Sequence, residues 1–572
     1  MDSLIIEKML RPMFISYSIC DAKTLQIEAI LGGLVKSQER PIRVFENRVL
    51  VGENGRTNEN YLDENMLWTY SSSSNSVPFS NNINDIRRAL WLVTDNNYKK
   101  AITNYEAKMS ALSQQSLTEE ELQLLDFSPV TKSEVVVPYK SIVLIKSEME
   151  SLARNLSSVF TKYPAIQKSG VSVFVYDGMV YFANSEGTSV QYPLQITSIR
   201  VTAKTQAPSG EVLDDHVLWF ARDISQLPDE KTMIAEVGKM AENLSGLTQK
   251  SAVSEPYSGP VLFEGQAAAE VFVQKFITNV NGLVAVRKPI IGSEVVMTYA
   301  PEKVKENTLE AMMNKKIISR DISITALPTL VSFQNIDLVG RFIADAEGVA
   351  APDTVILVEN GVLKNLLCSR TPSLKMKQSN GHARPALSNG GIKTVTGPGV
   401  IQMTNNNPAT SVERSKLKEL LLAAAKEEDL EYAYIVRKVL SDAAGVESES
   451  QVYYYGVSAP KADLSKTIQV YRVKVSDGSE ELVSLAEVQG LTVKSFKRLL
   501  ATSSEMQVYN TMINPVNSDL QNWGYKLTGI PASIIMPEGL LFEEIDVVKE
   551  KQGVVKNIPV VSNPVSSGNM NH

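Results

Sequence analysis

The chain contains 572 residues, enough for more than one hydrophobic core, because single cores stop growing at about 250 to 300 residues. Its 57 Lys and Arg and 64 Asp and Glu give a formal net charge of −7, with the two signs interspersed. This balance argues against nucleic-acid binding as a main role. The two cysteines, Cys20 and Cys368, are too few for a disulfide framework and lack metal-ligand spacing, so we expect buried thiols.

The sequence contains no membrane-spanning or export pattern. No apolar run approaches the roughly 20 residues that cross a bilayer, and the opening residues, MDSLIIEKML, lack the charged start and apolar stretch of a signal peptide. We therefore expect a cytoplasmic protein without a membrane span. The given sequence is also compatible with an exported protein whose signal peptide has been removed, so export remains an alternative.

The first 100 residues begin with strand-like runs and continue into a long helical pattern. The runs 14–19, 25–35 and 42–51 are rich in β-branched and aromatic residues, which predicts an antiparallel meander. The Ser- and Asn-rich stretch 71–82 predicts an exposed loop. Helical spacing of apolar residues predicts a helix over 84–115, capped by Asn84 and open to a break at 94–97.

The next 150 residues combine two helical patterns with further strands. We expect helices at 140–163 and 229–247, and strands at 191–203 and 216–224. The run VSVFVY-DG-MVYFANS predicts a hairpin in which Asp177 and Gly178 form a tight turn. The polar segment 248–258 predicts a linker, which gives an N-terminal α+β domain at 1–250, with an antiparallel sheet and long helices.

The second half contains many short strand patterns and few helices. This composition predicts a mainly antiparallel, barrel-like β domain over 256–565, a flexible tail at 566–572, and an α+β fold overall. Helices are expected at 411–427 and 493–502. The expected strands are 260–263, 322–330, 355–359, 362–368, 432–439, 452–457, 468–475 and 534–548.

Three segments of the second domain resemble one family. The run GPVLFEGQAAAE leads from a strand into an Ala-rich helix, DAEGVAAPDTVILVENGVLKNLLCSRTP covers 345–372, and SNGHARP covers 379–385. In the first domain, FISYSICD and the helix IRRALWLVTDNNYKKAITNYEAKMSAL resemble a long-form subgroup. Together these matches resemble the TldD/PmbA family of metallopeptidase-related proteins, also called modulators of DNA gyrase.

The resemblance implies a two-domain fold, a second-domain groove for an extended peptide, and pairing of like or related subunits. Active members carry two histidines and a glutamate on the Ala-rich helix, where the histidines bind zinc and the glutamate lies beside the bound water. The corresponding positions here are Phe272, Val273 and Ile277, and no cysteine follows Cys368 to replace the family's late cysteine ligand. We therefore expect no zinc and no other cofactor.

Two functions remain from the sequence. The favoured one is a non-catalytic PmbA-like (TldE-like) subunit that binds peptide, forms a homodimer when alone, and assembles with a motif-bearing TldD-like paralogue when one is present. The alternative is an active peptidase or amidase that uses a non-zinc set of residues. A nucleic-acid regulator, as the gyrase name suggests, gains no support from the charge balance.

The candidate peptide-groove residues are Glu264, Glu270, His382 and Arg384. His382 and Arg384 could bind a peptide carboxylate through charge-assisted hydrogen bonds, although a histidine in a Gly-rich loop is more often a turn residue. A buried Glu near the degenerate helix could act as a general base without metal, although solvated helix charges are commoner.

Two other arrangements invite a catalytic interpretation. Cys368 could be a nucleophile with His382 as its base, but a buried cysteine in a strand pattern is ordinary. His216 follows Asp214 and Asp215, yet neighbours in a strand alternate between faces, so these side chains are not expected to converge on one ion.

Overall fold

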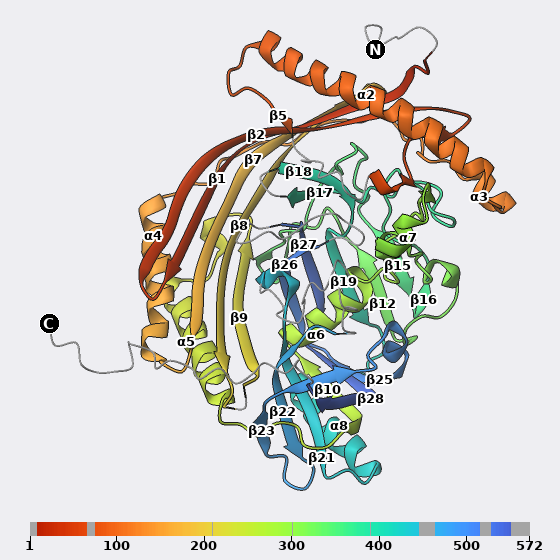
Figure 1. Ribbon diagram of the computed structural model, residues 1–572. Helices are drawn as coiled ribbons and strands as arrows, with labels where there is room; N and C mark the ends of the chain where they lie inside the picture. The colour runs from red at the N-terminus through yellow and green to blue at the C-terminus, as the bar shows by residue number, and fades with distance from the viewer. Residues whose placement is uncertain are drawn as a thin grey trace.

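The computed structural model describes residues 9–65, 75–208, 210–299, 301–388, 391–445, 464–514 and 528–550. A long, curved N-terminal sheet wraps around a C-terminal part built on two further sheets (Figure 1). The expected mixed α+β class is confirmed. No helix in these described ranges has the length and apolar character needed to cross a membrane.

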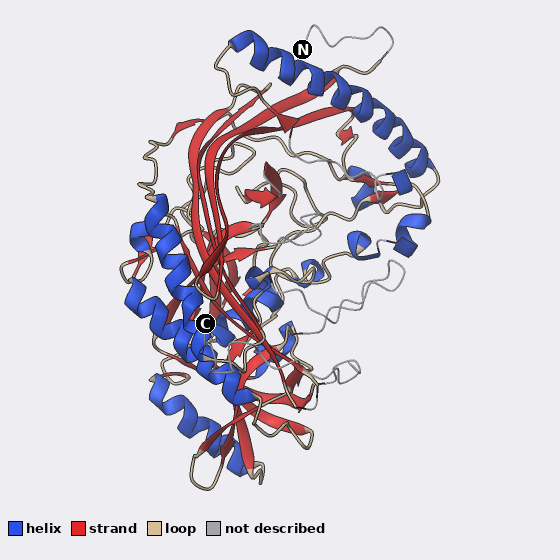
Figure 2. Ribbon diagram, turned by 60° about the vertical axis from the view of Figure 1, so that its left-hand side comes forward, coloured by secondary structure: helices blue, strands red, loops and turns tan. Residues whose placement is uncertain are grey.

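The N-terminal sheet has the order β3-β2-β1-β7-β8-β6, with β5 paired to β2 and β9 paired to β8. Its strands and helices are β1 (Pro12–Ile30), β2 (Gly33–Glu53), β3 (Arg56–Thr57), β4 (Tyr61–Leu62, outside this sheet), β5 (Asn75–Ser76), α2 (Ile83–Ser113), α3 (Glu119–Gln123), β6 (Glu134–Val136), α4 (Lys146–Ser158), β7 (Lys168–Asn184), β8 (Ser189–Gln206), β9 (Val212–Ala221) and α5 (Glu230–Leu247). Helices α4 and α5 cover the convex face, and α2 lies across the far end of the sheet (Figures 1 and 2).

Most of the expected N-terminal elements are present, with different lengths. The meander of three strands is instead two long antiparallel strands, because β1 runs through both of the first two runs and turns at Leu31 and Gly32. Helix α2 is confirmed and continues without a break through 94–97, and its N-cap is Asn82 and not Asn84. The helix expected at 140–163 is shortened to α4 and a 3₁₀ turn, while α5 agrees with the prediction.

The predicted hairpin at Asp177 and Gly178 is wrong. Both residues lie inside β7, a continuous strand of 17 residues that pairs along its length with β1 and β8. Gly178 is opposite Ala22, and a Cβ at Gly178 would lie 2.4 Å from the Ala22 Cβ and 2.8 Å from the Asp21 carbonyl oxygen. The glycine therefore permits close approach of two strands and does not form a turn.

The C-terminal part contains two large open sheets, of order β20-β25-β28-β10-β21-β22-β23 and β16-β15-β12-β19-β27-β26. Most neighbouring strands are antiparallel, but β10–β21, β19–β27 and β20–β25 are parallel, and neither sheet closes into the expected barrel. The elements are β10 (Tyr257–Glu264), α6 (Gln266–Phe272), β11 (Ile290–Ile291), α7 (Val295–Tyr299), β12 (Ile322–Ala326), β13 (Ser332–Phe333), β14 (Ile336–Asp337), β15 (Val355–Glu359), β16 (Val362–Leu363), β17 (Ala383–Ser388), β18 (Gly391–Thr396), β19 (Val400–Asn405), β20 (Ser411–Val412), α8 (Arg414–Glu427), β21 (Tyr432–Val439), β22 (Thr467–Lys474), β23 (Glu480–Val483), β24 (Ala486–Gln489), β25 (Leu499–Ser503), β26 (Met506–Ile513), β27 (Ile530–Pro537) and β28 (Gly539–Lys549).

Two expected elements of this part differ from the structure. The helix expected at 493–502 is a 3₁₀ turn, Val493–Arg498, followed by β25. The strand expected at 534–548 is two strands, β27 and β28. The strand at 452–457 and the tail at 566–572 lie outside the described residues. Asn360 and Gly361, both with positive φ, form the turn between β15 and β16.

The two parts share a large apolar seam. Residues on the concave face of the N-terminal sheet, including Tyr176, Tyr192 and Phe220, cluster with Val339, Leu387 and other residues of the C-terminal part. Strands β4 and β11 also pair across the seam. We propose that the domain boundary lies between α5 and β10, with 1–250 and 256–565 as the two units.

Candidate functional site

The Ala-rich helix α6 lies in the core between the two C-terminal sheets (Figure 1). Gly265 adopts a positive φ of 56° between β10 and α6, a conformation that glycine adopts at little cost. The side chains of 267–269, 271 and 272 are all fully buried. A helix that is buried on every side packs as core, so α6 offers no open face of its own.

Helix α6 continues into one π-helical turn, Val273–Ile277. The Thr278 amide donates to the Val273 carbonyl oxygen at 2.9 Å, which is the i to i+5 bond of a π-helix. This wider turn brings residues five apart, such as Phe272 and Ile277, towards one face. The backbone therefore supports the spacing of the family's zinc motif, His-Glu-x-x-x-His. The histidines and the glutamate themselves are replaced by Phe272, Val273 and Ile277.

The side chains at these positions belong to an aromatic and aliphatic cluster. Phe272 stacks on Phe276 with ring centroids 5.3 Å apart, and Phe276 meets Phe496 edge to face at 4.8 Å. Val273 and Ile277 belong to the same core cluster. Carbon atoms cannot coordinate zinc, and the described residues include no group of three His, Cys, Asp or Glu side chains placed to hold a metal ion. These residues do not fit the family's zinc.

Glu270 lies on the same helix as a buried carboxyl group. Its Oε1 accepts a hydrogen bond from the Tyr509 hydroxyl at 2.6 Å, and its Oε2 accepts one from Gln274 Nε2 at 3.0 Å. Burial raises the pKa of the Glu270 carboxyl, against the opposing effect of its hydrogen bonds to Ser441, Tyr509 and Gln274. Both oxygens are therefore occupied by protein donors.

Glu264 lies in a different environment, at the end of β10. Its Oε2 accepts from Arg437 Nε at 2.8 Å, and its Oε1 lies 3.8 Å from Arg414 Nε. Arg437 also pairs with Glu480 at 2.7 Å. These contacts form a network of ion pairs at the end of the sheet, separate from Glu270.

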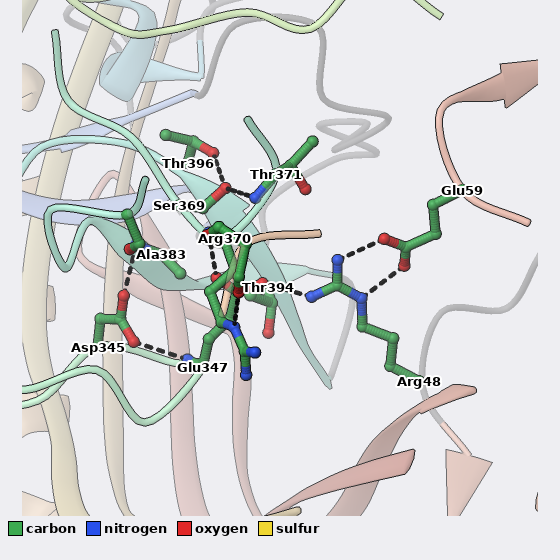
Figure 3. Close-up of polar contacts among 12 residues, drawn as sticks. Arg48, Glu59, Asp345, Glu347, Ser369, Arg370, Thr371, Ala383, Thr394 and Thr396 are labelled. Carbon is green, nitrogen blue, oxygen red and sulfur yellow. Dashed lines mark hydrogen bonds and ion pairs between the residues drawn. The ribbon is translucent and has the colours of Figure 1, made fainter. Parts of the chain in front are cut away.

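Two of the segments that carry the resemblance, 345–372 and 379–385, pack directly on one another (Figure 3). Asp345 accepts three backbone amides: those of Glu347 and Val349 at 2.9 Å on Oδ1, and that of Ala383 at 3.1 Å on Oδ2. Burial, reinforced by the negative charge of Glu347, raises the pKa of the Asp345 carboxyl. The turn at 345–348 thus organises the loop that carries His382.

Two arginines tie this turn to the N-terminal part (Figure 3). Arg48 of β2 binds both Glu59 and Glu347, and the Arg370 amide donates to Glu347 Oε2 at 2.7 Å. The Arg370 side chain is fully buried and binds Glu186 through the two terminal nitrogens of its guanidinium, at 2.6 and 2.8 Å. Both arginines face the Phe127 ring, at 4.6 and 3.8 Å from its centroid.

His382 is fully buried and uncharged. Its Nδ1 lies 2.9 Å from the Asn380 carbonyl oxygen and 3.1 Å from Asn380 Oδ1, and the latter already accepts the Cys368 amide. Both neighbours are acceptors, so we assign the proton to Nδ1, which leaves a lone pair on Nε2 without a partner. Burial lowers the pKa of His382 to about 4. A neutral imidazole of this tautomer has no donor to offer a carboxylate.

Arg384 lies beside His382 against the same ring. Its guanidinium lies 3.7 Å from the centroid of Phe342, and His382 meets that ring edge to face at 5.7 Å. Arg384 NH2 donates to the Gly340 carbonyl oxygen at 3.2 Å, while its Nε has no hydrogen-bond partner. The four candidate residues thus lie in three environments: Glu264 by its arginines, Glu270 by Tyr509, and the His382–Arg384 pair.

The proposed Cys368–His382 dyad does not form. The Cys368 thiol donates to the Gln378 carbonyl oxygen at 3.0 Å, and neither His382 nitrogen bonds to it. Burial raises the pKa of Cys368 to about 12, so the sulfur stays a thiol. Cys20 is buried as well, bonded to the Tyr176 hydroxyl at 2.8 Å.

Residues Asp214, Asp215 and His216 alternate along β9, as the strand pattern predicts. Asp215 pairs with Lys438 at 2.5 Å, and Asp214 pairs with Lys466 at 3.1 Å. Burial, followed by the nearby Lys438 charge, lowers the pKa of His216 well below its usual range. These residues link the two parts of the molecule and do not converge on a metal.

Comparison with known proteins identifies the relationship. A model of the PmbA/TldA metallopeptidase C-terminal domain matches residues 257–549, just over half of the chain. The chain belongs to the PmbA/TldD family. It is also 41% identical over 83 residues to a metalloprotease of Methanothermobacter thermautotrophicus, a match that covers 14% of this chain and 17% of that protein.

Three solved structures of similar fold each cover 94% of this chain. A modulator of DNA gyrase from Thermotoga maritima matches with a TM-score of 0.54, 13% identity, and coverage of 94% of this chain and 96% of that one. The corresponding protein of Bacteroides thetaiotaomicron gives a TM-score of 0.54, 13% identity, and coverage of 94% and 95%. TldE from Thermococcus kodakarensis gives a TM-score of 0.50 and 13% identity, and the match covers 94% of this chain and 97% of that one. At these identities the likeness concerns the fold alone.

Sequence reasoning did not single out some residues that organise this PmbA/TldD-family site. Glu347 joins Arg48 and Arg370 across the seam, and Tyr509 satisfies Glu270 from a strand more than 200 positions away. Glu347 lies in the segment 345–372, which is one of the segments that carry the resemblance. Tyr509 has no local signal, because only folding brings β26 against α6.

Proposed function

We propose that this PmbA/TldD-family protein is not itself a zinc peptidase, and that it acts by binding peptide or a partner subunit. The observation that carries the proposal is the set of side chains at the motif positions, Phe272, Val273 and Ile277. All three are buried in the core. The π-turn places 272 and 277 towards one face, yet that face packs against carbon.

The alternative, a peptidase or amidase with a non-zinc set of residues, gains its best support from Glu270. A buried carboxyl group with a raised pKa is a candidate general base. However, both of its oxygens are occupied by Tyr509 and Gln274, and the side chain is almost fully buried. We therefore favour a structural role for Glu270 in holding α6 against β26.

For the partner, we propose a homodimer when the chain is alone and a mixed assembly with a motif-bearing TldD-like paralogue when one is present. Symmetric pairing is the commonest form of oligomer. Helix α2 supports the proposal with exposed large apolar side chains, among them Ile83, Trp91 and Leu92. In the mixed assembly, peptide cleavage would depend on the paralogue's ligands.

Zinc content and peptide cleavage by the full chain test the proposal. We expect a tag-free preparation, dialysed against zinc and then against buffer, to contain far less than one zinc per chain by elemental analysis. We also expect no cleavage of an unstructured peptide, followed by mass spectrometry. One zinc per chain that is lost when residues of α6 are substituted would contradict the proposal. Cleavage that survives a chelator would favour the alternative.

A further inference from the structure

Three arginines from distant parts of the chain meet around the segment 340–342. Arg222, which follows β9, donates from NH1 to the Arg341 carbonyl oxygen at 3.4 Å. Arg384 donates from NH2 to the neighbouring Gly340 carbonyl oxygen at 3.2 Å. Arg341 contributes the third guanidinium. The segment itself is fixed, because the Gly340 amide donates to Ser533 Oγ at 3.1 Å and a Cβ at Gly340 would lie 2.2 Å from the Gly399 carbonyl oxygen.

Within the part of the chain that the structure describes, no carboxylate forms an ion pair with any of these three positive charges, although Asp337 acts on Arg222 and Asp345 acts on Arg384 electrostatically. The nearby acids have other contacts: Asp337 Oδ2 accepts Gln226 Nε2 at 2.5 Å, and Asp345 accepts three backbone amides. Burial lowers the pKa of Arg222 and that of Arg384 to about 10. A neighbouring arginine lowers each pKa further, whereas Asp337 opposes the shift at Arg222, and Tyr192 and Asp345 oppose it at Arg384.

Several donors in this cluster also lack acceptors. Nε of Arg384 and Nε of Arg341 are buried without a hydrogen-bond partner, and so is the hydroxyl of Tyr192, which feels the Arg384 charge. Arg384 is only 4% exposed and Tyr192 only 8%. Buried donors of this kind are rarely left unsatisfied in folded proteins, so their convergence indicates a missing acceptor.

We propose that Arg222, Arg341 and Arg384, together with the Tyr192 hydroxyl, form a binding site for a carboxylate. The guanidinium fork matches a carboxylate in two-point geometry. A bound carboxylate would give these guanidinium groups the ion-pair partner that they lack among the described residues. The Arg384 guanidinium lies over the Phe342 ring, 3.7 Å from its centroid.

The place of the site in the fold suggests the source of the carboxylate. The cluster lies on the concave side of the N-terminal sheet, where β17 faces β8 and β9 (Figure 1). Arg222 and Arg341 are half-buried, so the cluster is not sealed from solvent. We assign the carboxylate to the C-terminus of a bound peptide, a step that rests on the peptide-binding function proposed above. A small free carboxylate is the other source of the same chemistry.

Fluorescence anisotropy on the full chain tests the site with two probes, fluorescein-labelled penta-alanine as its free acid and as its C-terminal amide. We expect the free acid to bind at least tenfold more tightly than the amide. Arg384→Met and Arg341→Gln should each remove that preference. Arg498→Gln is the matched control, because Arg498 is exposed and pairs only with Glu543 and Glu544 on the surface; it should leave the preference unchanged.

A thermal-shift titration with sodium acetate distinguishes the two sources. Stabilisation by acetate that disappears in Arg341→Gln, with the penta-alanine acid no tighter than acetate, would support the site and assign it to small carboxylates. Equal binding of the acid and the amide, together with no effect of acetate, would overturn the site.

If Arg384→Met does not fold, Arg341→Gln and Arg222→Gln decide the question, since both side chains are half-buried. The proposed function fails separately: zinc-dependent cleavage by the wild type would refute it whatever the preference for the free acid.

Discussion

Replacing Phe272 by alanine should destabilise the C-terminal part strongly. The ring is fully buried and stacks on Phe276 within the core cluster between the two sheets. A Phe-to-Ala change in such a core costs about 3 to 5 kcal/mol, since the lost transfer free energy adds to that of the cavity left behind. Unfolding entropy is about 2.1 cal/mol/K per residue, so with all 572 residues unfolding as one unit Tm should fall by about 2.5 to 4 °C.

Differential scanning fluorimetry of the full chain measures this shift, and Phe79→Ala is the matched control. Phe79 is 57% exposed, so its truncation should change Tm by about 1 °C or less. A Phe272→Ala variant as stable as Phe79→Ala would show that α6 does not pack as core. The interpretation that the motif positions are occupied by core side chains would then be refuted.

Two further predictions concern pH and strand packing. The folded pKa of His382 is depressed to about 4, so its stabilising contribution is complete above pH 6.5 and is lost as the pH falls towards 4. At about 1.4 kcal/mol per pKa unit, this shift corresponds to about 3 kcal/mol of stability. The fall in Tm between pH 6.5 and pH 4 should therefore be smaller in His382→Gln than in the wild type. Identical pH profiles of Tm would contradict the depressed pKa of His382. Gly178→Ala should lower Tm by several degrees, because its Cβ would meet Ala22, whereas Gly170→Ala in the same strand has open space and should not. Equal effects of the two glycine variants would contradict the close approach of β1 and β7.

Long periodic segments of the fold could be predicted from the sequence, and short local signals misled. Helices α2 and α5 follow from apolar spacing over many residues. The Asp177-Gly178 pair is a good turn signal locally, but pairing with strands on both sides keeps β7 extended. The run 493–502 is too short for its period to separate helix from strand, and tertiary contacts divide it between a 3₁₀ turn and β25.

The candidate site was predictable in part. The positions Phe272, Val273 and Ile277 could be found because flanking residues such as Gly265 and the alanines keep the resemblance. The π-turn could not be found, since hydrogen bonding and not composition defines it. The contact between Arg222 and Arg341 could not be predicted either. The two residues are 119 positions apart in the sequence, and only the packing of the two parts of the molecule brings them together.

Arg370 has a consequence for how the chain can be divided. It lies within the segment that the family model matches, yet its carboxylate partner, Glu186, and its aromatic neighbour, Phe127, both come from the first half of the chain. A fragment cut at the matched segment would retain a buried guanidinium while losing the groups that neutralise it. The segment that the family model matches is therefore smaller than the unit that is expected to fold by itself.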